Sequence, residues 1–352
     1  MKKINPTILI LGFYGHGNIG DEAMLKNIII HIRRRIPNSK IFVVIPPDFI
    51  IPEHLKIFSN LGFMGIHERG RLHEADLLII GGGDLGAGFG SDYLIFARAN
   101  NIKSVFIGVS IGNVWAEPDV IKLNELLLGC YDKIYVRDKQ SLENTKLLNL
   151  KNAYLSTDIA IDLPVYFDKD LLSLPGSFFA LCIREVRKQD ELRQINWTKR
   201  FLENLYPKYN LILLPFCNQD KILAQNILKG TKLQIPILFD SNPEYQNYII
   251  SKSQAVISVG RLHPLVFAVS HAKPMFTVTY PEQYKYHKIH AWMDNFDQSE
   301  FVLNFSNVLE QFNEKWPIFV NKLDNISSHL RNYKNNLVKL NNDMFDIILR
   351  GL

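Results

Sequence analysis

The sequence is poor in cysteine: its three cysteines are Cys130, Cys182 and Cys217, among 352 residues. They lie far apart, and neither a Cys-x-x-Cys pair nor a group of histidines accompanies them. This pattern indicates neither a disulfide framework nor a structural zinc site. We therefore expect a protein of the reducing cytoplasm that binds no metal.

Long hydrophobic runs are also lacking. No stretch approaches the roughly 20 apolar residues of a membrane-spanning helix. The apolar run Ile8–Leu11 is short and leads into a glycine-rich turn without a small-residue cleavage site, so it does not indicate a signal peptide. If the protein meets a membrane, we expect peripheral contact at the inner face.

The excess of positive charge is small, with a formal net charge of +5. The visible basic cluster, His31–Arg35, ends a predicted helix, where the helix dipole favours solvated cations. Attraction to anionic lipid or to a phosphorylated substrate is the alternative. Because no interleaved basic and aromatic residues accompany the cluster, we expect no binding of nucleic acid.

Apolar residues, in contrast, make up 47% of the chain, and charged residues 21%, which is typical of globular proteins. The length exceeds that of one ordinary hydrophobic core and favours two domains. The first half alternates apolar runs with helical segments such as Glu22–Ile36, which predicts a parallel sheet covered on both faces. The expected strands are Thr7–Phe13, Lys40–Ile45, Ala75–Ile80, Val105–Val109 and Lys133–Val136.

A second series of strands is expected at Phe179–Ile183, Leu211–Leu214, Ala255–Ser258 and Met275–Val278. The interpretation is an α/β protein with doubly wound domains at residues 1–168 and 178–300, joined by the linker Asp168–Ser177 and followed by a helical tail at 301–352. We expect the two domains to face a cleft, with ligands outside the carboxyl ends of the strands.

The tail predicts one long helix with a single apolar stripe, because apolar residues recur at alternating spacings of three and four. The stripe consists of Leu323, Ile326, Leu330, Tyr333, Leu337, Leu340, Met344 and Ile347. We expect this helix to pack back against the body of the protein. A coiled coil that forms a homodimer is the alternative.

Two glycine-rich turns follow predicted strands. Gly15–Gly20 matches Gly-x-Gly-x-x-Gly, but Asp48 is a poor match for the acidic residue that a dinucleotide site places about 20 positions on. The turn either connects strand and helix, with Asn18 and Asp21 as caps, or holds an anionic part of a substrate on its amides. Gly81–Gly83 is the second turn, where the backbone comes close to a helix or a ligand.

Ionisable side chains also follow the strands of the second series. Arg184 directly follows its strand, where it binds a ligand or pairs with Glu185. Gly260-Arg261-Leu262-His263 lies between a strand and a helix expected at 265–272. Arg261 offers a fork suited to carboxylate or phosphate, and His263 can exchange a proton near neutral pH. A structural arginine with a capping histidine is the alternative.

Taken in order, these segments resemble the polysaccharide pyruvyl transferase family. The resemblance rests on Gly15–Ala23, Gly81–Leu85, Val136-Arg137-Asp138 with Ser141, Asp158–Ala160 and Arg261-Leu262-His263. These motifs lie within residues 8–285, which leaves out little but the tail.

The resemblance implies a GT-B-type transferase with two Rossmann-like domains, which uses phosphoenolpyruvate to form a pyruvate ketal on a sugar. It implies that Arg184 and Arg261 clamp the donor's carboxylate and phosphate, that Leu262 lines the donor pocket, and that His263 is the general acid or base. No cofactor is expected besides this donor substrate. The acceptor is a sugar of a cell-envelope polysaccharide or of a lipid- or nucleotide-linked glycan. The acceptor residues are expected at Gly17, Asn18, Asp21, Gly82 and Gly83.

The chain departs from the family at Gly260, where members often carry serine. It also departs at Tyr280–Gln283, which changes the usual spacing from tyrosine to lysine and leaves Lys285 as a candidate for that lysine. Two other functions are alternatives. A GT-B glycosyltransferase would use a nucleotide sugar, with Glu282 as a candidate ribose ligand. A non-catalytic glycan-binding or scaffold protein would have no need of Arg184, Arg261 and His263.

Overall fold

The computed structural model describes residues 5–46, 51–65, 68–112, 118–165, 174–185, 191–206, 208–279 and 288–352. Of the residues singled out above, Asp48, residues 168–173 of the expected linker, Tyr280–Gln283 and Lys285 lie outside these ranges. The chain divides into two compact units. Unit 1 contains Met1–Leu163, Tyr284–Ala291 and Asn336–Leu352, and unit 2 contains Pro164–Gln283 and Trp292–Asn335.

Unit 1 is built on a seven-stranded parallel sheet with the order β3-β2-β1-β4-β5-β6-β7. The strands are β1 (Thr7–Leu11), β2 (Lys40–Ile45), β3 (Leu61–Gly65), β4 (Leu77–Gly83), β5 (Lys103–Val109), β6 (Lys133–Val136) and β7 (Ala153–Leu155). Chain order runs one way from β1 and the other way from β4, so the topological switch point lies between these two strands. Ligands of doubly wound sheets bind at the carboxyl ends of the strands that flank such a point.

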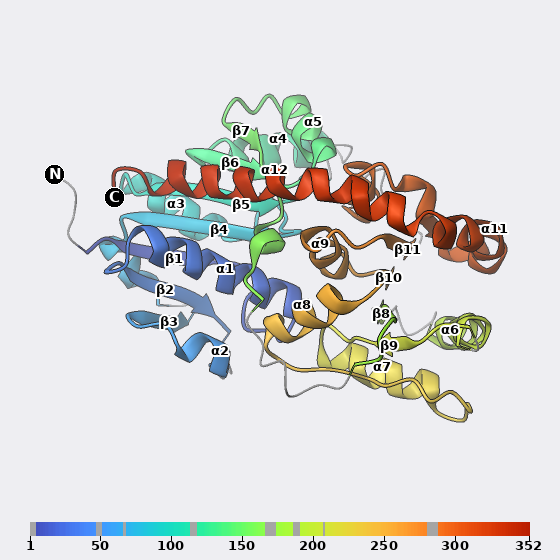
Figure 1. Cartoon of the computed structure of the whole chain (residues 1–352). Coiled ribbons are helices and arrows are strands. Elements are labelled where there is room, and N and C mark those ends of the chain that lie inside the picture. The colour runs from blue at the N-terminus through green and yellow to red at the C-terminus, as the bar shows by residue number, and fades with distance from the viewer. Residues whose placement is uncertain are drawn as a thin grey trace. The chain divides into compact units, whose positions relative to one another are not determined.

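The helices of unit 1 connect successive strands (Figure 1). They are α1 (Ile19–Arg35), α2 (Glu53–Lys56), α3 (Ser91–Ala99), α4 (Pro118–Leu128) and α5 (Lys139–Leu147), with short 3-10 turns at Arg69–Glu74 and Ile159–Asp162. Because parallel crossovers are right-handed, the connections on the two sides of the switch point place α1 and α3 on opposite faces of the sheet. Both faces are therefore covered, which explains why β1 and β4 are buried along their whole length.

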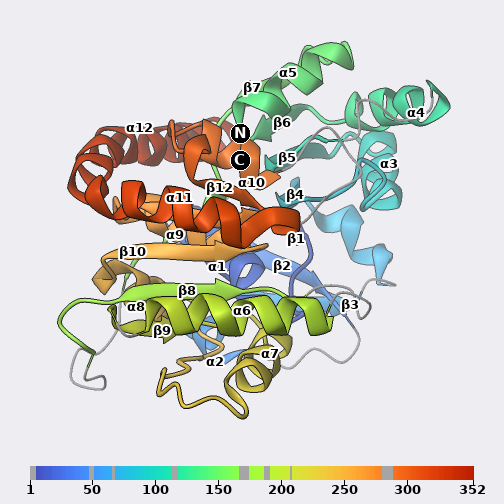
Figure 2. The ribbon, with the colours of Figure 1, turned by 90° about the vertical axis from the view of Figure 1, so that its right-hand side faces the viewer.

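Unit 2 contains a five-stranded parallel sheet with the order β12-β11-β10-β8-β9. Its strands are β8 (Phe179–Ile183), β9 (Leu211–Leu213), β10 (Ala255–Val259), β11 (Met275–Thr279) and β12 (Val302–Asn304). Its helices include α6 (Glu191–Leu205), α7 (Asn218–Leu228), α8 (Pro243–Lys252), α9 (His263–Ser270) and α11 (Val308–Asn321), while α10 (Lys288–Asp294) bridges the sequence boundary between units. Figure 2 shows β8 and β10 side by side. The switch point of this sheet lies between them.

The predicted fold class is confirmed: every strand expected from an apolar run is present, within a few residues of the expected ends. Three further strands, β3, β7 and β12, were not predicted. They are edge strands of three to five residues, and none forms a continuous buried apolar run. Edge strands contact only one neighbour, so their sequences carry a weaker hydrophobic signal.

The predicted tail helix is present as α12 (Leu323–Leu349), but its buried face departs from the predicted stripe near the end. Leu330 and Met344 are buried as expected, whereas Ile347 is 39% exposed and Phe345 and Ile348 are buried instead. A straight α-helix has 3.6 residues per turn, so a strict seven-residue repeat drifts around it by about 20° per heptad. The tail thus buries apolar side chains within the chain itself, as expected of a helix that packs back.

The basic cluster at the end of α1 forms contacts within the protein. Arg33 donates to the backbone oxygens of Ser39 and Ser59, at 2.7 and 2.6 Å. Arg35 pairs with Asp346 of α12 at 2.6 Å. These two guanidinium groups thus hold a loop and the last turns of the tail, which gives the cluster a structural role. No helix in the described ranges is long and apolar enough to cross a membrane.

Candidate active site

Two predicted donor-binding segments meet at the switch point of unit 2. Ile183 of β8 is aligned with Val259 of β10, and the next residues, Arg184 and Gly260, therefore leave the sheet at the same edge. The backbone N–H of Arg184 donates to the carbonyl of Val259 at 2.9 Å, which extends the pairing of the strands by one residue. The structure thus brings Arg184 to the strand end from which Arg261 also emerges.

The turn after β10 is tight and leads directly into a helix. Gly260 has a φ of +69°, in the left-handed region that disfavours a serine or any other residue with a side chain. The hydroxyl of Ser258 donates to the carbonyl of Arg261 at 2.5 Å and fixes the turn. Helix α9 begins at His263, two residues earlier than expected, so the histidine lies in the first turn of the helix. A glycine at position 260 therefore suits the backbone of this turn.

Arg261 is held by a carboxylate that was not singled out from the sequence. Its Nε and Nη2 donate to the two carboxylate oxygens of Asp220 at 2.9 and 2.7 Å, and Nη2 also approaches the Sγ of Cys217 at 2.9 Å. The side chain of Asp220 is 1% exposed and that of Arg261 13%. Asp220 belongs to α7, which follows β9 at the same edge of the sheet. Arg261 therefore has a structural partner, as in the alternative interpretation, and it also lies at the strand end where the donor site was predicted.

The other members of the predicted donor site differ in exposure. Arg184 is exposed, and within the described ranges its side chain forms no ion pair, including the considered one with Glu185. The carbonyl of Arg184 accepts a hydrogen bond from Gln194 at 2.5 Å, which fixes the backbone. Leu262 is 5% exposed and His263 is partly buried. Arg184 therefore offers a solvent-accessible cation, and Leu262 an apolar wall.

The two glycine turns meet at the switch point of unit 1, since β1 and β4 are paired neighbours. The hydroxyl of Tyr14 donates to the carbonyl of Gly81, which joins the two turns directly. Asn18 caps α1 by accepting from the backbone N–H of Gly20 at 3.1 Å, as expected of a capping residue. A side chain at Gly83 would begin 3.5 Å from a carboxylate oxygen of Asp21. The residues predicted for the acceptor thus gather at one place in this unit.

Gly17 and Gly82 have different surroundings within that group. A Cβ atom at Gly17 would contact nothing within 4 Å, so the loop backbone faces open space there. A Cβ atom at Gly82 would lie 2.4 Å from the sulfur of Met24, so this glycine serves the packing of α1 on β4. Of the two alternatives for the second glycine turn, a nearby helix therefore explains Gly82.

Glu22 is a further ionisable residue of this site whose importance the sequence did not reveal. It is 3% exposed, and its Oε1 accepts from the backbone N–H of Gly15 at 2.8 Å. Its Oε2 is buried and has no hydrogen-bond partner within the described part of the chain. Burial raises the pKa of this carboxyl to about 7, against the opposing effect of the Gly15 hydrogen bond. Glu22 can therefore gain or lose a proton near neutral pH.

The neighbouring phenol of Tyr14 is also perturbed. Burial raises its pKa, and the carboxylates of Asp21, Glu22 and Asp158 raise it further. The switch point of unit 1 is consequently an acidic environment. A phosphate bound on the amides of this loop would face the carboxylates of Asp21 and Glu22, which favours an uncharged ligand over an anionic one.

Other motifs of the family resemblance form a buried network that supports the sheet. Arg137 pairs with Asp158 at 2.9 Å, with side chains 2% and 0% exposed. Arg137 also donates to the hydroxyl of Ser110 at 2.8 Å. Asp138 caps α5 through the backbone N–H of Ser141 at 2.6 Å. These contacts join the ends of β5, β6 and β7, so these motif residues stabilise the strand ends of the unit 1 sheet.

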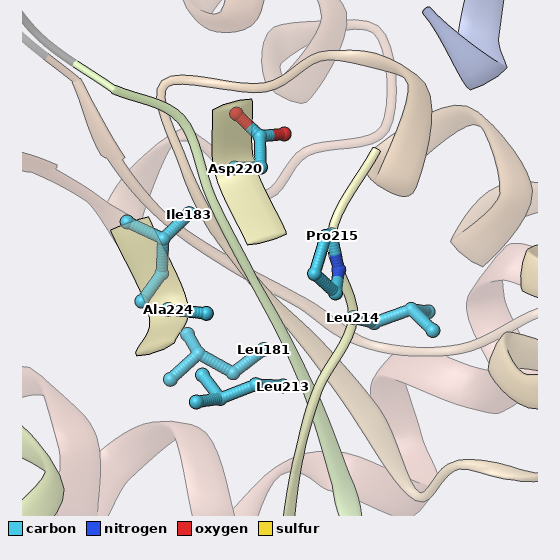
Figure 3. A pocket seen from close by; sticks show the side chains of 7 residues that line it. All are labelled: Leu181, Ile183, Leu213, Leu214, Pro215, Asp220 and Ala224. Carbon is cyan, nitrogen blue, oxygen red and sulfur yellow. The ribbon is translucent and has the colours of Figure 1, made fainter. Parts of the chain in front are cut away.

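The pocket beside Asp220 is narrow. Figure 3 shows its carboxylate at one end and the apolar side chains at the other. The lining residues are Leu181, Ile183, Leu213, Leu214, Pro215, Asp220 and Ala224. The pocket has no space for a water molecule, so these walls keep solvent from one side of the carboxylate. Within the described residues, His, Cys, Asp and Glu side chains form no group of three or more suited to a metal ion.

Comparison with known proteins gives a family and a fold. The model of the polysaccharide pyruvyl transferase family matches residues 18–282, more than half of the chain. No curated protein matches the sequence significantly.

Solved structures with low sequence identity share the fold. A glycotransferase of kitacinnamycin has 9% identity and a TM-score of 0.61, with 100% of each chain covered. HepE of Anabaena, in complex with UDP and glucose, has 12% identity and a TM-score of 0.60, over 97% of this chain and 99% of that one. A UDP-GlcNAc 2-epimerase of Neisseria meningitidis has 13% identity and a TM-score of 0.57, with 95% and 100% covered. The fold is thus that of the GT-B glycosyltransferases and epimerases.

Proposed function

This chain belongs to the polysaccharide pyruvyl transferase family, and from that premise we propose that it transfers the pyruvyl group of phosphoenolpyruvate to two hydroxyls of a sugar, forming a pyruvate ketal. The observation that carries the proposal is that Arg184 and Gly260-Arg261-Leu262-His263 follow the adjacent ends of β8 and β10, at the switch point of unit 2. Phosphoenolpyruvate is a small trianion with a carboxylate and a phosphate. Arginine is suited to both groups.

The roles of these residues follow from their settings. Arg184, which is exposed, binds one anionic group of the donor as a solvent-accessible cation. Arg261, whose guanidinium is held in place by Asp220, binds the other. Fixed donors of this kind lower a reaction barrier because they need not reorganise as the charge develops.

His263 carries the proton in this mechanism. It delivers a proton to the methylene carbon of phosphoenolpyruvate, which makes the adjacent carbon cationic, and a sugar hydroxyl attacks that carbon. Phosphate then leaves as a second hydroxyl closes the ketal. The protons balance. One sugar hydroxyl proton returns to His263, which gave its own proton to the methyl carbon, and the other leaves with the phosphate.

The acceptor is proposed to bind at the glycine turns of unit 1, through Gly17, Asn18, Asp21 and Gly83. An uncharged sugar hydroxyl suits the carboxylates there better than a phosphate does. The open space at Gly17 leaves room for such a group. A lipid-linked or nucleotide-linked acceptor would place its phosphates elsewhere.

Incubation with phosphoenolpyruvate and a panel of glycosides tests the proposal. We expect phosphate release that depends on the acceptor, with a mass gain equal to that of pyruvic acid less one water. His263→Ala should abolish this turnover without loss of folding, while His329→Ala, an exposed histidine of unit 2, should leave it unchanged. Transfer from a nucleotide sugar in the same panel, with no phosphate from phosphoenolpyruvate, would instead favour a glycosyltransferase.

A further inference from the structure

We propose that Asp220 is a positioning residue for Arg261, which fixes the plane of its guanidinium so that the group is set for the donor before the donor arrives. This inference rests on the proposed function of Arg261 in donor binding. Asp220 itself contacts no donor atom in this account and acts through the arginine.

The geometry of the pair is that of a two-point clamp. Two carboxylate oxygens accept from Nε and Nη2 of Arg261, at 2.9 and 2.7 Å. Two parallel hydrogen bonds to a planar group define its orientation as well as its position. The second hydrogen of Nη2 is directed to the Sγ of Cys217 at 2.9 Å. One edge of the guanidinium is thus fully committed to this clamp.

The clamp is itself held rigidly. Asp220 lies in the first turn of α7, and its Oδ2 also accepts from the backbone N–H of Phe216 at 3.1 Å. Its side chain is 1% exposed, and the apolar walls in Figure 3 keep water from one side of it. A buried carboxylate held by a backbone donor and a helix has little freedom to follow the arginine. The arginine must therefore take the orientation that the carboxylate dictates.

Two physical consequences follow. An arginine that is already ordered loses less side-chain entropy when a ligand binds than a flexible one does. The pair also carries no net charge, so Arg261 attracts an anion through directed N–H groups, while Arg184 supplies the uncompensated charge. The effect of Asp220 should therefore appear in the rate of transfer more than in the affinity for a trianion.

The test is a double-variant cycle on phosphate release from phosphoenolpyruvate. We expect Asp220→Asn, which keeps the shape and removes the charge, to lower kcat by roughly tenfold to a hundredfold, in the range known for misplaced catalytic groups. The KM for phosphoenolpyruvate should change by less than about threefold, because the lost clamp leaves one more net positive charge at the site. Asp324→Asn, an exposed aspartate of unit 2, is the matched control and should leave both constants unchanged.

The decisive comparison is the same substitution in an Arg261→Gln background. If Asp220 acts through Arg261, Asp220→Asn adds no further loss of kcat there. An equal loss in both backgrounds would overturn the inference and leave a general structural role. Thermal unfolding of each variant shows whether it folds, and Asp220→Glu replaces Asp220→Asn in the cycle if the latter does not. A wild-type protein without phosphate release would overturn the proposed function and this inference together, whereas an additive cycle in an active protein overturns the inference alone.

Discussion

Glu22→Gln should stabilise the protein at neutral and alkaline pH. The carboxyl of Glu22 is almost wholly buried, and burial raises its pKa from 4.5 to about 7. Ionising it in the folded state is therefore harder than in the unfolded chain. The difference of about 2.5 between the two pKa values, at about 1.4 kcal/mol for each pKa unit, corresponds to roughly 3 kcal/mol of unfolding free energy. Glutamine keeps the acceptor for the N–H of Gly15 and cannot ionise.

The sign of the effect follows from proton binding. Between pH 4.5 and 7 the folded protein holds the proton of Glu22 and the unfolded chain does not, so the stability of the wild type falls as the pH rises. Two histidines work in the opposite direction: His54, which is buried, and His271, which is partly buried. Burial, aided by nearby lysines, lowers the pKa of His54 and of His271 to about 4, so their contributions raise stability between pH 4 and 6.5.

Urea unfolding of wild type and Glu22→Gln between pH 4 and 8.5 measures the effect. The histidines are common to both proteins, so the difference between the two free energies isolates Glu22. We expect this difference to move in favour of the variant by roughly 3 kcal/mol between pH 4.5 and 7.5 and to stay constant above that. A difference that is independent of pH, or a variant that becomes relatively less stable as the pH rises, would refute the argument from burial.

Two further substitutions test the frame around the sites. Asp162→Ala removes the carboxylate that His31 contacts at 3.1 Å beneath the tail helix α12. We expect chemical denaturation to show a loss of about 3 kcal/mol of unfolding free energy, as for other broken buried pairs. Asp343→Ala, at an exposed position of α12, should cost less than about 0.5 kcal/mol. Gly81→Ala would place its Cβ atom 2.1 Å from a backbone oxygen of β5 at a φ of +146°. We expect a loss of about 3 kcal/mol or more of unfolding free energy, measured by thermal or urea unfolding. Gly86→Ala should change little, because its Cβ atom would meet nothing within 4 Å. If either variant were as stable as its control, the packing described above would be contradicted.

Hydrophobic patterning was sufficient to predict the central strands, because a strand buried on both faces must be apolar along its length. The apolar runs that precede Arg184 and Arg261 likewise placed these residues after strands, and parallel pairing then brings them to one edge. The edge strands β3, β7 and β12 escaped prediction because a strand with one neighbour need not be continuously apolar, whereas the edge strand β9 is buried throughout and was predicted. The buried face of the tail was predicted only in part, because its last turns follow the period of a straight helix, with Phe345 and Ile348 buried in place of Ile347.

The residues missed at the sites share one property: their chemistry comes from neighbours distant in the sequence. Asp220 is one acidic residue among many until β9 and β10 bring it within 2.7 Å of Arg261, 41 positions away. Glu22 stands in a motif that was recognised, yet its raised pKa results from burial by the surrounding fold. An aspartate in the first turn of a helix after a strand is the one signal that could have drawn attention to Asp220.

The source of the methyl hydrogens in the product shows whether the protein protonates phosphoenolpyruvate and transfers its pyruvyl group. The wild-type protein is incubated with phosphoenolpyruvate and an accepted glycoside in deuterium oxide, and the product is analysed by mass spectrometry and NMR. We expect a ketal whose methyl group carries one deuterium from solvent, formed together with an equal amount of phosphate. A product that carries no carbon-bound deuterium, or that has gained a sugar rather than a pyruvyl group, would contradict the proposed function.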